Sequence, residues 1–280
     1  MTTATHTETN TPLSGTSPLA PSSADTIPLQ KKSPGLHTVL DTRPASTHAF
    51  VRVLKRAGIT IVHVPMIRIE GVEKNDEITA AFEMLHSYDA VLLTSMNAVR
   101  YFSALMQEAE IDPDMLPPVF AVGPKTAGAA RREGFALQSL PSESYGATMA
   151  AELPDVRERR FLQPCSEIAR EEVALGIRER GGTVDQLIVY RTLPPTEENA
   201  ARLAELAEAK AYDGVVFFSP SAVRHYAELL PEEVRPSVTV AVIGKTTAAE
   251  AEARGMKVDI IPIEQTAESL TEALIRWEKE

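Results

Sequence analysis

Serine, threonine and glycine residues gather where apolar strands are expected to run into helices. The stretch "AVIGKTTAAEAEARG", residues 241–255, contains the Gly-Lys-Thr of a P-loop, but position 239, five residues before Gly244, is a threonine and not the required glycine. We therefore reject a P-loop. The simpler interpretation is that a strand ends at Gly244 and that Thr246 or Thr247 caps the following helix. The unpaired N–H groups and positive dipole end of such a helix attract anions.

The same turn occurs a second time in the chain. "AVGPKTAGAARREGF", residues 121–135, repeats the order of apolar strand, glycine, threonine and alanine-rich helix at an offset of 121. This alignment pairs Gly123 with Gly244 and Thr126 with Thr247.

Two further pairs of segments are similar. "YDAVLLTSMNAVRYF" (88–102) matches "YDGVVFFSPSAVRHY" (212–226) at an offset of 124, and residues 37–65 resemble residues 160–190 more faintly. Repetition of whole strand–helix segments indicates an internal duplication of α/β units.

The two copies concentrate hydroxyls, an amide and turn N–H groups at matching strand ends. These candidate binding residues are Ser95, Asn97, Gly123, Thr126, Ser219, Ser221, Gly244, Thr246 and Thr247. Each alone is more often a plain helix cap, whereas together they predict a polar site for a multiply anionic ligand. The six histidines form no ligand-spaced pair, Cys165 lacks a motif partner, and no G-x-G-x-x-G is present. We therefore expect no metal, no nucleophilic cysteine and no dinucleotide.

Composition suits a two-domain cytoplasmic protein. The chain has 280 residues, of which 44% are apolar, and no apolar run approaches the length of a membrane span. A single cysteine is compatible with a reducing compartment. The formal charge of −11 argues against nucleic-acid binding, which needs a basic surface.

The chain alternates strands with helices, which predicts an α/β fold. Short, nearly continuous apolar strands are expected at 38–42, 60–65, 90–95, 119–123, 160–165, 184–190, 214–219, 239–244 and 258–262. Such strands, separated by amphipathic helices, indicate two doubly wound parallel sheets of about five strands each.

The order of the repeats predicts how the chain passes between the two domains. Residues 37–70 and 195–280 are expected to form one discontinuous domain, and residues 71–194 a second domain inserted into it. Two segments, 68–73 and 190–198, would link them, and ligands of such sheets bind beyond the carboxyl ends of the strands. Residues 1–36, rich in Thr, Ser and Pro, are predicted to be a disordered tail.

The ordered set of motifs resembles the uroporphyrinogen-III synthase family. The similar stretches are "VLDTRPASTHAFVRVLKRAGITIVHVPMIRI", "LLTSMNAVRYF", "AVGPKTAGAARREG", "VYRT", "VVFFSPSAVRHY" and "AVIGKTTAAEAEARG". The resemblance implies two α/β domains joined by a two-stranded linker, with the active site in the cleft. It also implies conversion of linear hydroxymethylbilane to cyclic uroporphyrinogen III, with loss of water and inversion of the last pyrrole ring, without metal or cofactor.

The implied substrate carries eight carboxylates, which the resemblance places against turn N–H groups and hydroxyls. Arg43 and Arg170 could add charge there, although both could equally be solvated arginines at helix starts. The chain departs from the family's Ser-Pro at Ser95-Met96-Asn97, and "QPCSE" (163–167) stands where a glycine-rich turn is common.

Loss of the substrate hydroxyl needs a proton, and the resemblance points to Tyr190 of "VYRT" as its donor. A tyrosine stays protonated at neutral pH, because its ordinary pKa is about 10. The alternative for Tyr190 is interdomain packing. The alternatives for the chain are a non-catalytic hinged protein that binds an anionic metabolite and, as a weaker one, a two-domain glycosyl or phosphoryl transferase. Transient contact with the preceding pathway enzyme is a further expectation.

Overall fold

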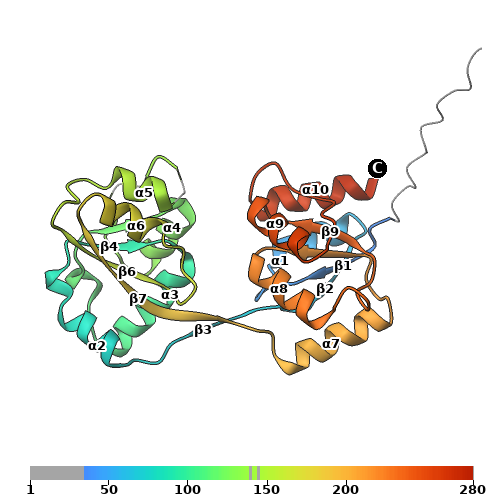
Figure 1. Ribbon diagram of the computed structural model, residues 1–280, viewed down its shortest axis with the longest axis horizontal. Coiled ribbons are helices and arrows are strands. Elements are labelled where there is room, and N and C mark those ends of the chain that lie inside the picture. The colour runs from blue at the N-terminus through green and yellow to red at the C-terminus, as the bar shows by residue number, and fades with distance from the viewer. Residues whose placement is uncertain (1–34, 139–140, 144–145, 280) are drawn as a thin grey trace, which may run out of the picture. The chain divides into compact units, whose positions relative to one another are not determined.

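The computed structural model describes residues 35–138, 141–143 and 146–279. Nearly all of the predicted disordered tail, residues 1–34, lies outside these described residues. Its predicted boundary at residue 36 is wrong by at least one position, because Leu36 is buried in an apolar core. The described chain forms two α/β units, each built around one sheet (Figure 1).

The first unit, which we call the four-stranded unit, has the strand order β2-β1-β8-β9 with all strands parallel. Its strands are β1 (Thr38–Asp41), β2 (Thr60–His63), β8 (Gly214–Phe217) and β9 (Thr239–Val242). Its helices are α1 (His48–Arg56), α7 (Glu197–Glu208), α8 (Pro220–Leu229), α9 (Lys245–Ala253) and α10 (Ala267–Lys279). Adjacent residues of β8 belong to different cores, Val215 to one and Val216 to the other, so both faces of the sheet are covered.

The second unit, the five-stranded unit, has the order β3-β7-β6-β4-β5, with β3 antiparallel to β7 and the other pairs parallel. Its strands are β3 (Arg68–Gly71), β4 (Ala90–Leu93), β5 (Val119–Ala121), β6 (Arg160–Ser166) and β7 (Thr183–Leu193). Its helices are α2 (Asp76–Glu83), α3 (Met96–Glu108), α4 (Gly123–Arg132), α5 (Gly146–Glu152) and α6 (Glu172–Glu179), with short 3-10 turns at Leu85–Ser87 and Pro113–Met115. One core packs between the sheet and α2, α3 and α4, and another between the sheet and α5 and α6.

The strand order confirms the internal duplication. The order β2-β1-β8-β9 in one sheet corresponds to β7-β6-β4-β5 in the other, as the three pairs of similar segments predict. Equivalent aspartates even make equivalent bonds. Asp213 accepts from the backbone N–H of Thr38 at the start of β1, and Asp89 accepts from that of Arg160 at the start of β6.

Two details differ from the sequence prediction. The segment 258–262 was expected to be a fifth parallel strand, but it makes only an isolated bridge between Ala241 and Ile260. The side chain of Ile261 is exposed, so this segment leaves the sheet after a single pairing. In the other unit, the antiparallel β3 is an addition to a sheet that was expected to be wholly parallel.

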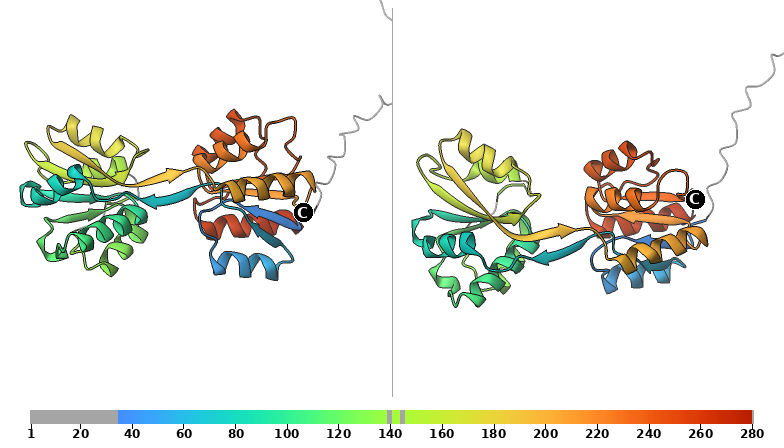
Figure 2. Two further views of the ribbon diagram at one scale, coloured as in Figure 1. Left: turned by 90° about the horizontal axis from the view of Figure 1, so that it is seen from below. Right: turned by 60° about the horizontal axis from the view of Figure 1, so that its bottom comes forward.

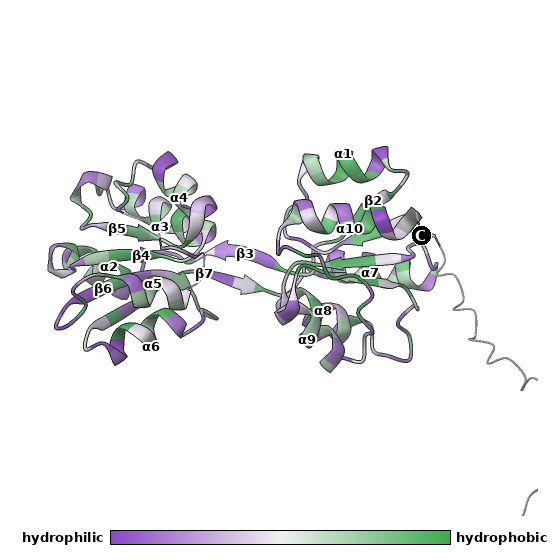
Figure 3. Cartoon of the chain, turned by 90° about the horizontal axis from the view of Figure 1, so that it is seen from above, coloured by the Kyte–Doolittle hydropathy of each residue, from purple (hydrophilic) through white to green (hydrophobic). Residues whose placement is uncertain are grey.

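Strands β3 and β7 run side by side within the segments predicted to link the two units (Figure 2). β3 is an edge strand and is largely hydrophilic (Figure 3), as suits a strand with one unpaired side. The division into domains at residues 70/71 and 194/195 stays a prediction. Its first boundary falls inside β3, whose residues all pair with β7 of the five-stranded unit. No helix within the described ranges is long and apolar enough to cross a membrane.

The predicted threonine caps are wrong. Helix α9 begins after Gly244 and helix α4 after Val122, and in the described part of the chain neither helix has a side-chain cap. Thr126 and Thr247 lie inside the first turn or just beyond it, and both are buried. These threonines therefore pack inward with the alanines that follow them. Gly123 has a φ of 78°, a conformation that favours glycine.

Candidate functional site

A cavity of about 1280 Å³ lies at the carboxyl ends of strands from both sheets. Its lining includes Thr42 and Arg43 after β1, Thr94 and Ser95 after β4, and Ser219 after β8. These positions follow the rule that ligands of open α/β sheets bind beyond the carboxyl ends of the strands. The side chains that line the cavity in each unit determine which ligand groups it can bind.

In the five-stranded unit, the Tyr190 side chain from β7 lines the cavity and is 9% exposed. Its hydroxyl lies 3.3 Å from the Ser95 hydroxyl, and its ring stacks on that of Tyr101 from α3, with centroids 5.7 Å apart. Burial raises the pKa of Tyr190 above its ordinary value, against a smaller lowering effect of the Ser95 contact. The phenol is therefore protonated at neutral pH and can donate a proton.

Ser95 links Tyr190 to the start of helix α3. It is the N-cap of the helix, and its Oγ accepts the backbone N–H of Ala98 at 3.0 Å. Because this bond uses a lone pair, the Ser95 hydroxyl keeps its own proton to donate to the Tyr190 oxygen. The positive end of the helix dipole faces the same place. A phenolate formed at Tyr190 would be stabilised by both.

A buried amide, that of Gln163 in β6, also lines the cavity. Gln163 is 1% exposed, and its Oε1 has no hydrogen-bond partner among the described residues. An orphaned buried acceptor is uncommon in folded proteins and calls for an explanation. Cys165, two residues further along the strand, lines the cavity as well. Burial raises the pKa of its thiol to about 11, so it is not a thiolate at neutral pH.

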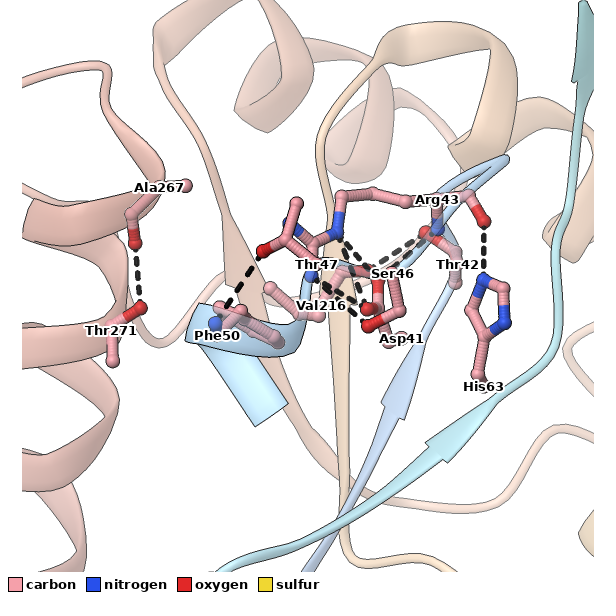
Figure 4. Close-up of polar contacts among 10 residues, drawn as sticks. All are labelled: Asp41, Thr42, Arg43, Ser46, Thr47, Phe50, His63, Val216, Ala267 and Thr271. Atoms are coloured by element: carbon pink, nitrogen blue, oxygen red, sulfur yellow. Dashed lines mark hydrogen bonds and ion pairs between the residues drawn. The ribbon is translucent and has the colours of Figure 1, made fainter. Parts of the chain in front are cut away.

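In the four-stranded unit, Arg43 is held from several sides (Figure 4). Its Nε and Nη2 donate to the two carboxylate oxygens of buried Asp41, at 2.9 and 2.7 Å. Its guanidinium carbon lies 4.1 Å from the ring centroid of Phe50 and 4.3 Å from that of Phe218. His63 bonds the Arg43 carbonyl through Nε2 at 2.8 Å. This bidentate, ring-flanked arrangement fixes the guanidinium in one orientation.

The environment of Arg43 contradicts one of its two predicted interpretations. Arg43 is not a solvated arginine at a helix start, because its side chain is 10% exposed and α1 begins only at His48, after the N-cap Thr47. Its Nη1 has no hydrogen-bond partner among the described residues. Arg170 is different. Its side chain is 67% exposed and lies 3.9 Å from Glu172, two residues before α6.

The cavity brings together about half of the predicted site residues. Seven line it: Arg43, Ser95, Asn97, Arg170, Tyr190, Ser219 and Ser221. Five lie outside its lining: Gly123, Thr126, Gly244, Thr246 and Thr247. Ser219 repeats the role of Ser95 as a helix cap, accepting the N–H of Ala222 at 3.2 Å, while Ser221 accepts from Arg224 at 2.9 Å.

The cavity residues that were not predicted from the sequence include Gln163, Tyr101 and Phe218. The only signal for Gln163 was a polar residue inside the apolar strand "RFLQPC". The only signal for Tyr101 was its difference from His225, the residue at the matching position of the repeat. No sequence signal pointed to Phe218. Among the described side chains, no three His, Cys, Asp or Glu residues gather as metal ligands would. That the site works without metal or cofactor stays a prediction.

Comparison with known proteins gives one consistent family. The family model described as "Uroporphyrinogen-III synthase HemD" matches residues 48–272. The chain is 32% identical to the uroporphyrinogen-III synthase of Chlorobaculum parvum over 239 residues, which are 81% of this chain and 93% of the relative. It is 23% identical to that of Synechococcus elongatus over 254 residues, which are 87% of this chain and 96% of the relative.

Solved structures share the fold. A mutant uroporphyrinogen III synthase from Thermus thermophilus has a TM-score of 0.63 at 20% identity, covering 87% of this chain and 99% of its own. The uroporphyrinogen-III synthetase of Helicobacter pylori has a TM-score of 0.60 at 15% identity, covering 85% of this chain and 97% of its own. At these identities the structural likeness speaks for the fold alone.

Proposed function

The chain belongs to the uroporphyrinogen-III synthase family, and we propose that it converts hydroxymethylbilane to uroporphyrinogen III. The linear substrate loses water, its last pyrrole ring is inverted, and the macrocycle closes. The observation that carries the mechanism is the buried Tyr190 hydroxyl, which lines the cavity beside Ser95 at the start of α3.

Tyr190 is the proton donor in this proposal. The terminal hydroxyl of the substrate leaves as water when its C–O bond breaks, and Tyr190 supplies the proton that the leaving oxygen needs. Its raised pKa keeps the phenol protonated until the substrate binds. The resulting phenolate accepts a hydrogen bond from Ser95. Ring closure forms a carbon–carbon bond and releases a proton from the reacting pyrrole carbon, which restores the phenol.

The cavity's polar lining supports binding of a substrate with many carboxylates. We propose that hydroxyls, an amide and guanidinium groups bind them: Ser95, Asn97, Ser219, Ser221, Arg43 and Arg170. Asp41 compensates much of the Arg43 charge, so Arg43 contributes a fixed N–H donor more than a net positive charge. For Gly123, Thr126, Gly244, Thr246 and Thr247, substrate binding stays a prediction.

The decisive experiment compares the wild type with Tyr190→Phe, which keeps the ring and its stacking. Hydroxymethylbilane is generated enzymatically, and the type I and type III products are separated after oxidation. Loss of a positioned acid typically costs about 10²–10⁴-fold, and we expect kcat to fall by at least about tenfold. Because unassisted closure gives the type I isomer, that product should then dominate.

Two outcomes would contradict different parts of the proposal, the synthase activity and the role of Tyr190. If the wild type formed no type III product, the synthase activity would be wrong. If Tyr190→Phe kept a near wild-type rate of type III formation, Tyr190 would not be the acid. We further propose a cytoplasmic location and transient contact with the enzyme that supplies this unstable substrate.

A further inference from the structure

We propose that Tyr101 is a positioning residue that holds the Tyr190 hydroxyl in its reactive orientation, and that Gly71 provides the space it needs. This inference deepens the proposed function and rests on it. All of the residues involved belong to β3, α3 and β7 of the five-stranded unit.

The stacking of the two rings is the first observation. The Tyr101 and Tyr190 ring centroids lie 5.7 Å apart, with 23° between the ring planes. The only polar contact of the Tyr190 hydroxyl among the described residues is the bond of 3.3 Å to Ser95, which is long for a pair of hydroxyls. The ring stack is therefore a principal restraint on the direction of the Tyr190 side chain.

Tyr101 is itself fixed by strand β3. Its hydroxyl donates to the Ile69 carbonyl at 2.8 Å, which anchors the far end of the ring. The bond connects helix α3 to an edge strand that pairs with β7. Both ends of the Tyr101 side chain, its backbone in α3 and its hydroxyl on β3, are thus held.

Gly71 explains how the ring fits over the strand. A Cβ atom added to Gly71 would lie 2.7 Å from Cδ1 and 3.0 Å from Cε1 of Tyr101. Gly71 is also the residue of β3 that pairs with Tyr190 in the antiparallel ladder. The glycine, the Tyr101 ring and the Tyr190 backbone therefore meet at one place. Any side chain at residue 71 would push the Tyr101 ring away from its present position.

This arrangement matters because an acid must come within hydrogen-bond reach of the leaving oxygen. A phenol lies at the end of a side chain with two rotatable bonds, so a small rotation displaces its oxygen. A misplacement of about 1 Å can cost as much as about 10²-fold in rate. Holding Tyr190 in place should therefore affect kcat far more than substrate affinity.

The test uses Tyr101→Leu and Tyr101→Phe in the full-length protein, in wild-type and Tyr190→Phe backgrounds. Tyr101→Leu removes the stack, and we expect kcat to fall about ten- to a hundredfold while KM changes less than about twofold. Tyr101→Phe keeps the stack and should retain most of the kcat. In the Tyr190→Phe background, Tyr101→Leu should cause no further loss, since the group that it positions is gone.

Gly71→Ala provides a second route to the same effect. It leaves Tyr101 intact but displaces its ring, so kcat should fall while the variant remains folded by circular dichroism. The matched control is His225→Leu, which changes the repeat-equivalent position of Tyr101 in α8, outside the cavity lining. We expect this control to keep wild-type kcat and KM.

The inference is overturned if the losses from Tyr101→Leu and Tyr190→Phe are additive in the double variant, or if Tyr101→Leu raises KM and leaves kcat unchanged. Full activity of Tyr190→Phe would overturn it together with the acid assignment, while type III synthesis by the wild type still stood. A wild type without type III synthesis would overturn the proposed function itself.

Discussion

The buried side chain of Gln163 lowers the stability of the free protein but keeps a hydrogen-bond acceptor available for a ligand. Its Oε1 has no partner among the described residues, and the side chain lines the cavity. A buried acceptor without a bond costs about 1–3 kcal/mol of stability. Polar groups retained at such a cost are often found at binding sites, where a ligand donor completes them.

We predict that Gln163→Met, which keeps the length of the side chain, stabilises the free protein. Removing the unsatisfied acceptor should raise the free energy of unfolding by about 1 kcal/mol, because no bond is lost in exchange. Urea unfolding at neutral pH measures this change. Gln186→Met is the matched control, since Gln186 is the β7 residue paired with Gln163 but does not line the cavity. Clear destabilisation by Gln163→Met, with the control unchanged, would contradict the prediction.

At the scale of elements, the internal duplication gives two nearly identical helix starts. Ser95 caps α3 with φ −152° and ψ 155°, and Ser219 caps α8 with φ −156° and ψ 153°. Both accept the backbone N–H three residues later. Within the described residues, only Ser95 also contacts a tyrosine hydroxyl, that of Tyr190. The two repeats thus share the serine cap and differ in the contact with a tyrosine hydroxyl.

We predict that Ser95→Ala and Ser219→Ala lose the same stability but differ in activity. Each variant loses one cap, which costs about 1 kcal/mol of unfolding free energy. Ser95→Ala should also lower kcat by roughly three- to tenfold, because the Tyr190 phenolate loses a hydrogen bond. Ser219→Ala should leave kcat unchanged and raise KM by about two- to threefold. Equal kcat values for the two variants would show that Ser95 is only a cap.

At the scale of the whole molecule, both units contain buried tyrosines with raised pKa values. In the five-stranded unit, burial raises the pKa of Tyr88 to about 12 and raises that of Tyr190. In the four-stranded unit, burial raises the pKa of Tyr212 and of Tyr226, whose hydroxyls lie 2.8 Å apart. An unfolded tyrosine loses its proton near pH 10, before these folded ones do.

We therefore predict alkaline destabilisation. Above about pH 10 the folded chain binds more protons than the unfolded chain, so the free energy of unfolding falls as pH rises. The tyrosine contribution is fully present below about pH 10. Urea unfolding between about pH 8 and 11 measures the slope, which should be shallower in the double variant Tyr212→Phe/Tyr226→Phe. An unchanged slope in that variant would contradict the role of this pair.

The features that depend on local pattern were predictable from the sequence. Apolar strands and repeated segments predicted two sheets built from duplicated α/β units, and the spacing at Ser95 and Ser219 placed both at helix starts. These predictions succeed because caps and strand burial involve residues only a few positions apart. The family was identified from the resemblance of the ordered motifs.

Contacts between side chains from distant segments were not predictable from the sequence. The stack of Tyr101 on Tyr190 joins residues far apart in the chain, and it depends on the register that sets Gly71 opposite Tyr190. The side chains of Thr126 and Thr247 point inward because helices α4 and α9 begin before these residues, which were predicted to cap them. Such contacts depend on sheet register and helix packing. Because the whole core sets both, no short stretch of sequence predicts these contacts.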